Sequence, residues 1–297
     1  MKINNQLLEE VLGLKPSEEI ACDNLGLVAH SEPNMLTFVD DQRFIQEAVD
    51  NSNVTALFIS EQLASKIEST RIRKIICDDP RYYFYSLWNY LNKAAYQKSP
   101  ATIHPTANIH PQAFVSDYNV EIGKNVVIEP NATILPDVVI GDDCVIRAGA
   151  VLGSEGYEFK RTSRGILSVF HDGKVILGNN VEIGANSCLD KGFHYRDTKI
   201  GDSTKIDNLV HISHCVHVGK KCFIIAGSMV SGTVTIKDDV WLGPTSTIAP
   251  YVVIENEAFV TIGSVVTQNV NERGWVTGNF AIPHQKFLLN LKRSLKP

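Results

Sequence analysis

The sequence lacks the usual marks of metal-binding, membrane-spanning and nucleic-acid-binding proteins. Its six cysteines form no CxxC pair and show no metal-ligand spacing, so we expect reduced thiols and no metal. No stretch of about 18 apolar residues occurs, and acidic residues interrupt residues 1–20 where a signal peptide has an apolar core. At a formal net charge of −5, no run of like charge favours nucleic acid or an anionic membrane as a partner. The sequence therefore predicts a cytoplasmic protein.

What the sequence does contain is a six-residue repeat. From Ile200 to Val266 an aliphatic residue recurs at every sixth position without a break. Shorter runs with the same period begin at Ile103, Ile122 and Leu177. The residue four places after each aliphatic is small or β-branched almost throughout, and glycine often follows the aliphatic directly. This period fits neither a helix of 3.6 residues per turn nor a simple alternating strand.

Short strands joined at corners explain a period of six. The aliphatic residue fills the interior, the small residue packs beside it, and glycine tolerates unusual φ values at the corners. Three hexads close one triangular coil, so residues 18 apart stack at about one strand spacing of ~4.8 Å. The sequence therefore predicts a mainly β chain with a hexapeptide-repeat parallel β-helix of about eight coils. We assign this solenoid to residues 99–278.

The remaining segments are expected to close the two ends of the solenoid. Residues 1–98 contain no hexads and predict a small α/β domain, with helices at 5–12 and 80–91 and strands at 55–60 and 74–77. Residues 279–297 predict a helical cap with a short basic helix at 285–295. Open solenoid edges require such caps because their backbone groups are unpaired.

Three interruptions break the period. One extra residue separates Val115 from Ile122, and longer insertions occupy residues 153–174 and 192–199. Insertions in a solenoid form surface loops. The two longer ones contain aromatic and basic side chains, which suit ligand binding, although tolerated surface loops are the simpler alternative. The side chains are Tyr157, Phe159, Arg161, Arg164, Phe170, His171, Phe193, His194, Tyr195 and Arg196.

One histidine of the NLVHISHCVHVG segment is a candidate general base. His214 takes an outward position of its hexad, and Gly232 follows 18 residues later, one coil above. A glycine there lets a backbone N–H approach a ligand. A histidine and an amide so placed could accept a proton and hold an oxyanion. The alternatives are ordinary solvent-facing histidines or a three-histidine metal site, which the corner between His211 and His217 disfavours within one subunit.

The segments VEIGANSCLDKG and TKIGDSTKIDNLVHISHCVHVG resemble the catalytic coils of the UDP-3-O-acylglucosamine N-acyltransferases of the lipid A pathway. The resemblance covers nearly the whole chain, from LTFVDDQRF to the end of the repeats. It implies a left-handed β-helix, an N-terminal uridine-binding domain and a homotrimer. It also implies that His214 is the general base and that Gly232 supplies the oxyanion amide.

The resemblance further implies positions for the two substrates. The nucleobase clamp of the family falls on Phe38, Asp41 and Phe44. Asp190 (of the DxG ending at Gly192), Asn208 and Tyr157 would orient the sugar. The pantetheine of the donor would pass Ser228, Gly243 and Thr261, with its phosphates near Lys286 and Arg293.

Several departures from the family favour a related acceptor. Asp41 and Phe44 stand where the family has Asn and Tyr, Tyr251 replaces a histidine, and the C-terminal helix is short. These changes resemble the N-acyltransferases of nucleotide-linked amino-deoxysugars of the anthrose type. The sequence thus predicts transfer from acyl-CoA to a dTDP-linked 4-amino-4,6-dideoxy sugar. The lipid A enzyme using acyl carrier protein, a hexapeptide-repeat metalloenzyme of the carbonic-anhydrase type and a non-catalytic binding scaffold remain as alternatives.

Overall fold

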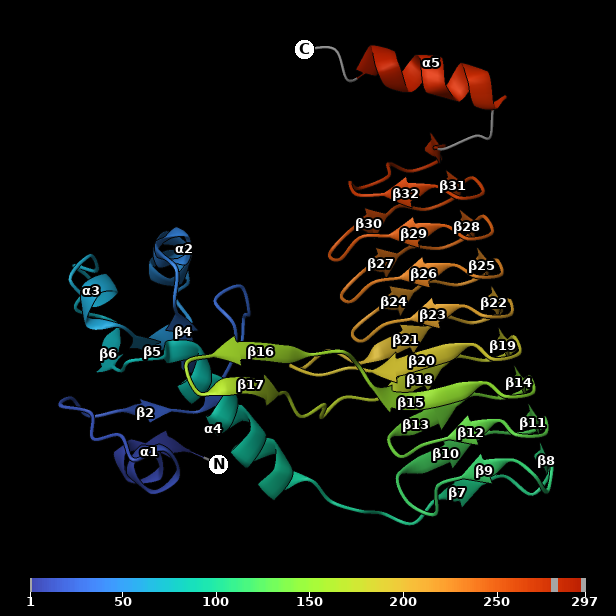
Figure 1. The fold of residues 1–297 in the computed structure, drawn as a ribbon. Coiled ribbons are helices and arrows are strands. Elements are labelled where there is room, and N and C mark those ends of the chain that lie inside the picture. Colours follow the sequence, from blue (N-terminus) through green and yellow to red (C-terminus); the bar gives the residue numbers. More distant parts are fainter. Residues whose placement is uncertain (1, 279–282, 295–297) are drawn as a thin grey trace. The chain divides into compact units, whose positions relative to one another are not determined.

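The computed structural model describes residues 2–278 and 283–294 and divides the chain into two units (Figure 1). The N-terminal unit comprises Met1–Gln97 together with Tyr157–Asp172. The solenoid unit comprises Lys98–Gly156 and Gly173–Pro297. Residues 157–172 therefore lie between two coils of the solenoid in the amino-acid sequence, but they belong to the N-terminal unit in the structure.

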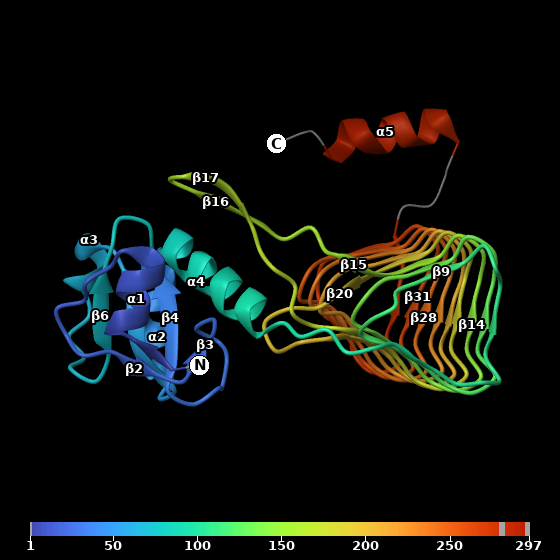
Figure 2. The same ribbon diagram turned by 90° about the horizontal axis from the view of Figure 1, so that it is seen from below.

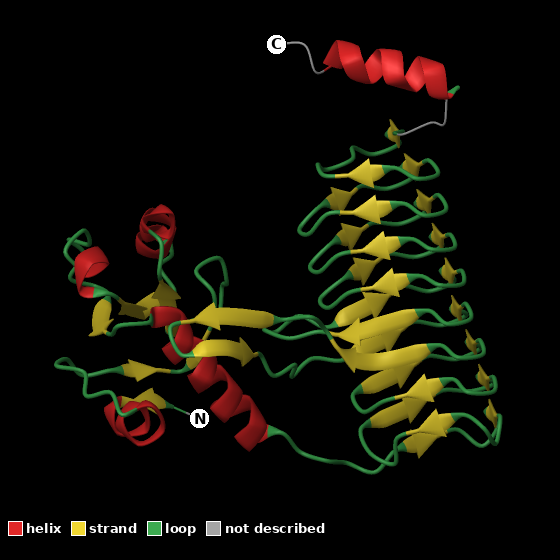
Figure 3. Ribbon diagram, viewed as in Figure 1, coloured by secondary structure: helices red, strands yellow, loops and turns green. Residues whose placement is uncertain are grey.

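The N-terminal unit is built on a four-stranded parallel sheet flanked by helices (Figure 3). The sheet order follows the chain, β3 (Asn24–Leu25), β4 (Met35–Val39), β5 (Val54–Ile59) and β6 (Arg73–Ile76). The helical elements are α1 (Asn5–Leu12), η1 (Gln42–Phe44), α2 (Ile45–Asp50), α3 (Glu61–Ala64) and α4 (Pro80–Ala95), and a small antiparallel pair joins β1 (Ile3–Asn4) to β2 (Ala21–Cys22). The predicted helix 5–12 and both predicted strands are confirmed to within one residue, while α4 extends four residues beyond its predicted end.

Helix α4 begins where the sequence contains a strong start signal. The side chain of Asp79 accepts a hydrogen bond from the Tyr82 amide, and Pro80 occupies the first turn, where its missing N–H costs nothing. The helix buries an apolar face that includes Phe84, Leu87 and Trp88. This face covers the sheet of the unit, in which β5 is almost wholly buried.

The solenoid unit is a parallel β-helix whose coils wind left-handedly around a triangular cross-section (Figure 2). Its three faces are parallel sheets of short strands. The first face contains β7 (Thr102–Ile103), β10 (Val120–Ile122), β13 (Val138–Ile140), β18 (Val175–Leu177), β21 (Thr198–Ile200), β24 (His217–Val218), β27 (Thr235–Ile236) and β30 (Val253–Ile254).

The second face contains β8 (Asn108–Ile109), β11 (Val127–Ile128), β14 (Val145–Ile146), β19 (Glu182–Ile183), β22 (Lys205–Ile206), β25 (Phe223–Ile224), β28 (Trp241–Leu242), β31 (Phe259–Val260) and β33 (Trp275–Val276). The third face contains β9 (Phe114–Val115), β12 (Thr133–Ile134), β15 (Val151–Glu155), β20 (Cys188–Lys191), β23 (His211–Ile212), β26 (Met229–Val230), β29 (Thr247–Ile248) and β32 (Val265–Val266).

The strand register confirms the predicted stacking of residues 18 apart. Ile212 pairs with Val230, and Ile200 pairs with Val218. Where an insertion intervenes the same stacking holds over a longer stretch of chain, as in the pairing of Leu189 with Ile212. The predicted aliphatic and small residues form one continuous buried core along the axis. The predicted fold is thus confirmed, including its coil length and interior.

The corners explain why the coils close so tightly. A residue with positive φ recurs every six residues, three places after the interior aliphatic, for example Asn125 (φ 54°), Asn131 (φ 60°) and Asp143 (φ 58°). Asn and Asp tolerate this left-handed conformation better than most residues. Near the middle of the solenoid the position is taken by less tolerant residues, including Cys215 (φ 61°) and the β-branched Thr233 (φ 65°).

The insertion at 153–174 forms a β-hairpin, not an irregular loop. Its strands β16 (Phe159–Thr162) and β17 (Gly165–Ser168) are antiparallel. The hairpin is attached to α4 within the N-terminal unit, since the indole N–H of Trp88 donates to the carbonyl of Phe170 (3.0 Å). The side-chain amide of Asn89 donates to the carbonyl of Ser168 (2.7 Å). These bonds account for the assignment of residues 157–172 to that unit.

The C-terminal segment contains the expected helix, α5 (His284–Ser294), which begins one residue before its predicted start. The last predicted residue of this helix, Leu295, lies outside the described residues. No helix in the described part of the chain is long and apolar enough to cross a membrane.

Candidate active site

His214 lies in the corner between β23 and β24, and Gly232 lies in the corner directly above it, between β26 and β27. The two corners are joined by a hydrogen bond from the Thr233 amide to the carbonyl of His214 (3.0 Å). The imidazole packs against the glycine so closely that an added Cβ would lie 2.5 Å from its Cε1 and 2.8 Å from its Nε2. The stacking predicted for this pair is therefore present.

The amide of Gly232 donates no hydrogen bond to any other group of the described residues. Its neighbours Ser231 and Thr233 do donate, to the carbonyls of Ile248 and His214. The corner thus leaves one backbone N–H beside the imidazole available for a ligand. A ligand that held a negatively charged oxygen would satisfy it.

The second insertion closes over the same corner. Phe193 is buried, and its ring lies 5.2 Å from the His214 ring between centroids. Arg196 attaches the loop to the coil, because its Nε donates to the carbonyl of Cys215 (2.6 Å) and its Nη2 to Oγ1 of Thr235 (2.9 Å). Burial lowers the pKa of the Arg196 guanidinium. The 192–199 insertion therefore packs against the corner that holds His214 and forms one side of the site.

Asp190 supplies a buried carboxylate next to the histidines. Its side chain is held by Ser154, whose hydroxyl donates to Oδ1 (2.6 Å), and its Oδ2 lies 3.6 Å from Nε2 of His211. Burial raises the pKa of this carboxyl, opposed by Ser154, by His211 and by His214. Asp190 therefore lies directly beside His211, the first histidine of the segment that also contains His214.

The other histidines of the motif do not converge with His214 on one metal. His211 lies on the third face and His217 on the first face, on either side of the corner that holds His214. Burial lowers the pKa of His217, and the positive charges of Arg196 and Lys199 add to this effect. The geometry within this chain therefore gives no support to the three-histidine alternative.

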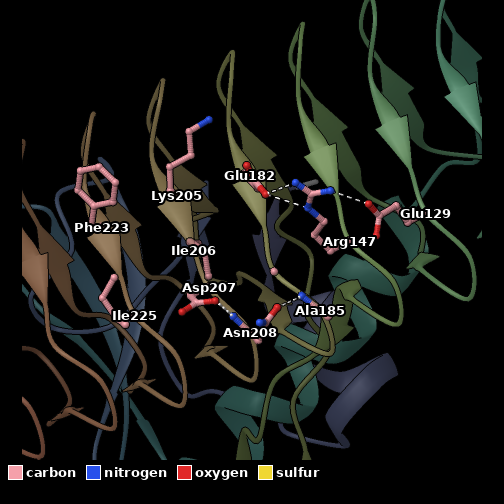
Figure 4. A pocket seen from close by; sticks show the side chains of 11 residues that line it. Glu129, Arg147, Glu182, Ala185, Lys205, Ile206, Asp207, Asn208, Phe223 and Ile225 are labelled. Atoms are coloured by element: carbon pink, nitrogen blue, oxygen red, sulfur yellow. Dashed lines mark hydrogen bonds and ion pairs between the residues drawn. The ribbon is translucent and has the colours of Figure 1, made fainter.

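Asn208 lies in a different corner of the same coil, between β22 and β23. Its side-chain oxygen accepts a hydrogen bond from the Ala185 amide (2.7 Å). It borders a groove of about 460 Å³ on the second face, whose charged side chains include Arg147 between Glu129 and Glu182 (Figure 4). The structure does not bring Asn208 together with His214 within one chain.

The predicted clamp residues all lie near the end of β4 in the N-terminal unit. Phe38 packs on Phe84 (ring centroids 4.8 Å apart), whereas Phe44 is 41% exposed. Asp41 caps η1. Its carboxylate accepts hydrogen bonds from the side chain and from the backbone amide of Arg43, and these bonds lower the pKa of the carboxyl. The Asp41 carboxylate is therefore already engaged by its own chain.

A groove of about 470 Å³ opens at the same edge of the sheet. Asp40 follows β4, Ser60 follows β5, and Asp78 and Asp79 follow β6, so the groove lies at the carboxyl ends of three parallel strands. Ligands of open α/β sheets bind at this edge. Residues 161–163 of the hairpin form its other side.

The residues predicted to bind the pantetheine and phosphates of the acyl donor do not line one continuous path. Ser228 is buried inside the solenoid, where its hydroxyl donates to the carbonyl of Ile225 (2.7 Å), so its side chain does not line a surface path. Gly243 permits close stacking of its corner on Thr261, since a Cβ would meet the Thr261 backbone at 2.7 Å. Lys286 and Arg293 are exposed on α5, and Tyr157, 88% exposed, belongs to the N-terminal unit.

Three residues of the site were not singled out individually from the sequence. Phe193 and Arg196 were included only in a general list of insertion residues, and Ser154 was not considered. Their roles depend on contacts that form only once the inserted segments have folded, and the repeat does not predict the course of the chain in those segments. The one available signal was the aromatic and basic content of the 192–199 insertion.

Comparison with known proteins confirms the resemblance to hexapeptide-repeat acyltransferases. Residues 119–154 match the family described as bacterial transferase hexapeptide (six repeats). The chain is 37% identical over 150 residues to the "Probable UDP-3-O-acylglucosamine N-acyltransferase 2, mitochondrial" of Arabidopsis thaliana, covering 50% of this chain and 49% of that protein. It is 36% identical over 143 residues to the UDP-3-O-acylglucosamine N-acyltransferase of Caulobacter sp. (strain K31), covering 48% and 42%.

Among solved structures, the chain is similar to the UDP-N-acetylglucosamine acyltransferase of Arabidopsis, with a TM-score of 0.48 and 22% identity over 59% of this chain and 71% of that chain. The chain spans about half or less of the length of the curated relatives that it matches.

Proposed function

We propose that this chain is an N-acyltransferase that moves an acyl group from a thioester donor to the amino group of a nucleotide-linked amino sugar. The observation that carries the proposal is the stacking of His214 on Gly232, with a side-chain base and an available backbone N–H at one corner. The names of the curated relatives agree with this chemistry.

The reaction follows from these two groups. The sugar amine attacks the thioester carbonyl, a C–N bond forms, and the carbonyl electrons move to oxygen. The Gly232 N–H holds the resulting oxyanion, a contribution typically worth about 3–4 kcal/mol to the barrier. His214 accepts the proton from the attacking nitrogen, as a histidine can near neutral pH. Collapse of the intermediate breaks the C–S bond, and the leaving thiolate takes up the proton.

The residues around the corner prepare it for this role. Phe193 covers one side of the imidazole and limits access of water. Asp190 lies beside His211, on the strand face next to the His214 corner, and can accept a hydrogen bond from a sugar hydroxyl or ammonium. Arg196 fixes the loop that carries Phe193, so the site is largely formed before a substrate binds.

The acceptor that we favour is a UDP-linked, 3-O-acylated glucosamine, because the curated relatives have that substrate in their names. Asp41 and Phe44 favour a second candidate, a dTDP-linked 4-amino-4,6-dideoxy sugar, since both differ from the residues that hold uracil in the resembling family. The engagement of Asp41 by Arg43 supports the view that Asp41 does not read the base as an Asn would.

The N-terminal unit is proposed to bind the nucleotide and the solenoid unit to perform the transfer. The groove at the carboxyl ends of β4, β5 and β6 supports nucleotide binding, as does the exposed ring of Phe44 next to it in sequence. A homotrimer in the cytoplasm and a choice between acyl-CoA and acyl carrier protein as donor complete the proposal.

One experiment tests both the reaction and the acceptor. The purified chain is mixed in turn with UDP- and dTDP-linked amino sugars and with acetyl-CoA, longer acyl-CoAs or acyl carrier protein, and free thiol and acylated sugar are measured. We expect thiol release only with an amino sugar present. Release with the dTDP-linked sugar alone would select the second acceptor. Hydration of CO₂ without any acyl transfer would instead favour the metalloenzyme alternative.

A further inference from the structure

Three metal-binding side chains converge on the third face of the solenoid. Cys188 and His211 occupy equivalent positions of neighbouring coils, since β20 pairs with β23 in that register. Asp190 follows two residues after Cys188 on the same strand. The Cys188 thiol, an Asp190 carboxylate oxygen and a His211 ring nitrogen all lie within 4.8 Å of one another.

The distances are close to those of a tetrahedral cation site. Oδ2 of Asp190 lies 3.6 Å from Nε2 of His211, and Oδ1 lies 3.7 Å from Sγ of Cys188. In a tetrahedral zinc site the bond lengths place neighbouring ligand atoms about 3.3–3.7 Å apart. The two separations involve different oxygens of Asp190, so a carboxylate that binds through one oxygen must turn slightly toward the second ligand. All three ligand atoms already lie within 4.8 Å of one another, so the shifts needed are small.

A hydrogen bond outside the three ligands fixes the carboxylate. The hydroxyl of Ser154 donates to Oδ1 of Asp190 (2.6 Å) and lies 3.3 Å from the Cys188 sulfur. Such bonds orient metal-ligating carboxylates and raise the affinity of the site. Asp190 is only 5% exposed, whereas the side chain of His211 is 36% exposed, so the site is shielded on one side and open to an entering ion on the other.

We propose that Cys188, Asp190 and His211 form a site for one divalent transition-metal cation, of which Zn²⁺ and Co²⁺ are the best matches. A thiolate, an imidazole and a carboxylate together suit these ions, whereas Mg²⁺ and Ca²⁺ take oxygen ligands. The fourth position is left to water. The inference does not depend on the proposed acyl transfer; where both hold, the cation and the amino sugar compete for Asp190.

Sequence spacing alone could not reveal this site. Cys188 and His211 are 23 residues apart because the 192–199 insertion adds five residues to the usual coil of 18. Neither the CxxC pair nor the closely spaced histidines of common metal motifs are needed when stacked coils supply the ligands. The cation-binding set becomes visible only in the folded solenoid.

Cobalt titration tests the site directly. Metal-free, reduced protein is titrated with Co²⁺ and followed by the visible d–d bands of tetrahedral cobalt and the ultraviolet thiolate-to-cobalt charge-transfer band, and Zn²⁺ is then added in competition. We expect one equivalent to bind with both sets of bands and to be displaced by Zn²⁺. Cys188→Ser should abolish the charge-transfer band, and Asp190→Asn and His211→Gln should each weaken binding at least tenfold. Ser154→Ala should weaken it by about tenfold, as expected for an outer hydrogen bond.

Cys144→Ser and His217→Gln are the matched controls, because both residues lie on the solenoid outside the three-residue set. Both should bind cobalt as the unmodified chain does. A charge-transfer band that persists in Cys188→Ser, or that disappears in Cys144→Ser, would overturn the proposal, as would the absence of stoichiometric binding. The readout is independent of acyl transfer, so an active enzyme without a cobalt site would reject this inference alone, and a cobalt-binding protein without activity would reject only the proposed function.

Discussion

A methyl group added at Gly232 would lie 2.5 Å from Cε1 of His214, in the coil below. The glycine therefore does two things at this corner. It leaves the space that the imidazole occupies, and its own N–H donates no hydrogen bond to another group of the described residues. Any side chain at this position would move the imidazole, whatever its chemistry.

Replacing Gly232 by alanine should consequently impair catalysis without unfolding the solenoid. We expect kcat to fall by about 10²-fold or more, the range seen when a single oxyanion donor is lost, because both the ring and the amide are displaced. Steady-state kinetics and the thermal midpoint are the measurements. Gly278→Ala is the control, since nothing lies within 4 Å of a Cβ there. An unimpaired Gly232→Ala enzyme would show that the corner is not the reacting centre.

Removal of the base itself gives a second prediction. His214→Ala should lower kcat by about 10²–10⁴-fold, the usual contribution of a general base, with a smaller change in KM. His217→Gln is a fair comparison because His217 lies in the same coil but on the next face. Near-wild-type turnover of His214→Ala would mean that the amine arrives deprotonated and that the leaving thiolate alone manages the proton.

The attachment of the 192–199 loop should matter for turnover through Phe193. Arg196→Gln removes a charge-assisted hydrogen bond to the Cys215 carbonyl, which is worth about 1.5–3 kcal/mol. We expect a lower kcat, because the Phe193 ring is no longer held against His214, together with faster amide exchange of the loop. Arg273→Gln serves as the control, since its partner Glu257 is at the surface and such pairs contribute about 0–1 kcal/mol. Equal kinetics for the two variants would argue against a positioning role of Arg196.

The fold could be predicted almost completely because its interior residues recur at a strict six-residue period in the sequence. Each interior aliphatic, such as Ile212 or Val230, is identified by its sequence neighbours six residues away, and no long-range information is needed. The same arithmetic placed Gly232 above His214. What the period could not show is the course of chain that leaves it, so the hairpin β16–β17 was expected as a loop of the solenoid and instead packs on α4.

The candidate site could be predicted only in part for the same reason. Cys188 and His211 stack across an insertion whose length changes the spacing, and Ser154 reaches Asp190 from the preceding coil. Ser228 shows the opposite error, since a small polar residue at a hexad position resembles a ligand contact but lies inside the coil. The Ser228 hydroxyl forms hydrogen bonds with backbone carbonyls inside the solenoid, including that of Gly243, and is therefore not available to a ligand.

The helix start at Asp79 predicts a pH-dependent contribution to stability. Burial acts to raise the pKa of this carboxyl, but hydrogen bonds from the amides of Ser163 and Tyr82 and the charge of Arg164 together hold it below its usual value. A carboxylate with a lowered pKa stabilises the folded state above its unfolded pKa, and this stabilisation is lost as the pH falls through the folded pKa. Asp79→Ala should therefore reduce the free energy of unfolding by about 1–2 kcal/mol at neutral pH, and by less at pH 3. Urea unfolding at the two pH values measures this; a constant difference would contradict it.

The two clamp phenylalanines should respond differently to the same substitution. Phe38 packs on Phe84 and Tyr85, so Phe38→Ala should cost several kcal/mol, about 3–5, and lower the thermal midpoint. Phe44 is exposed, and its ring centroid lies 5.8 Å from Cζ of Arg43, so Phe44→Ala should leave the midpoint within a few degrees. If Phe44 stacks on the nucleobase, its loss should raise KM for the nucleotide sugar several-fold with little change in kcat, since stacking contacts bind ground state and transition state alike. Isotope-labelled nucleotide binding, followed beside the kinetics, decides the point. A Phe44→Ala enzyme with unchanged KM for the nucleotide sugar would place the base elsewhere in the N-terminal unit and leave Phe38 with a purely structural role.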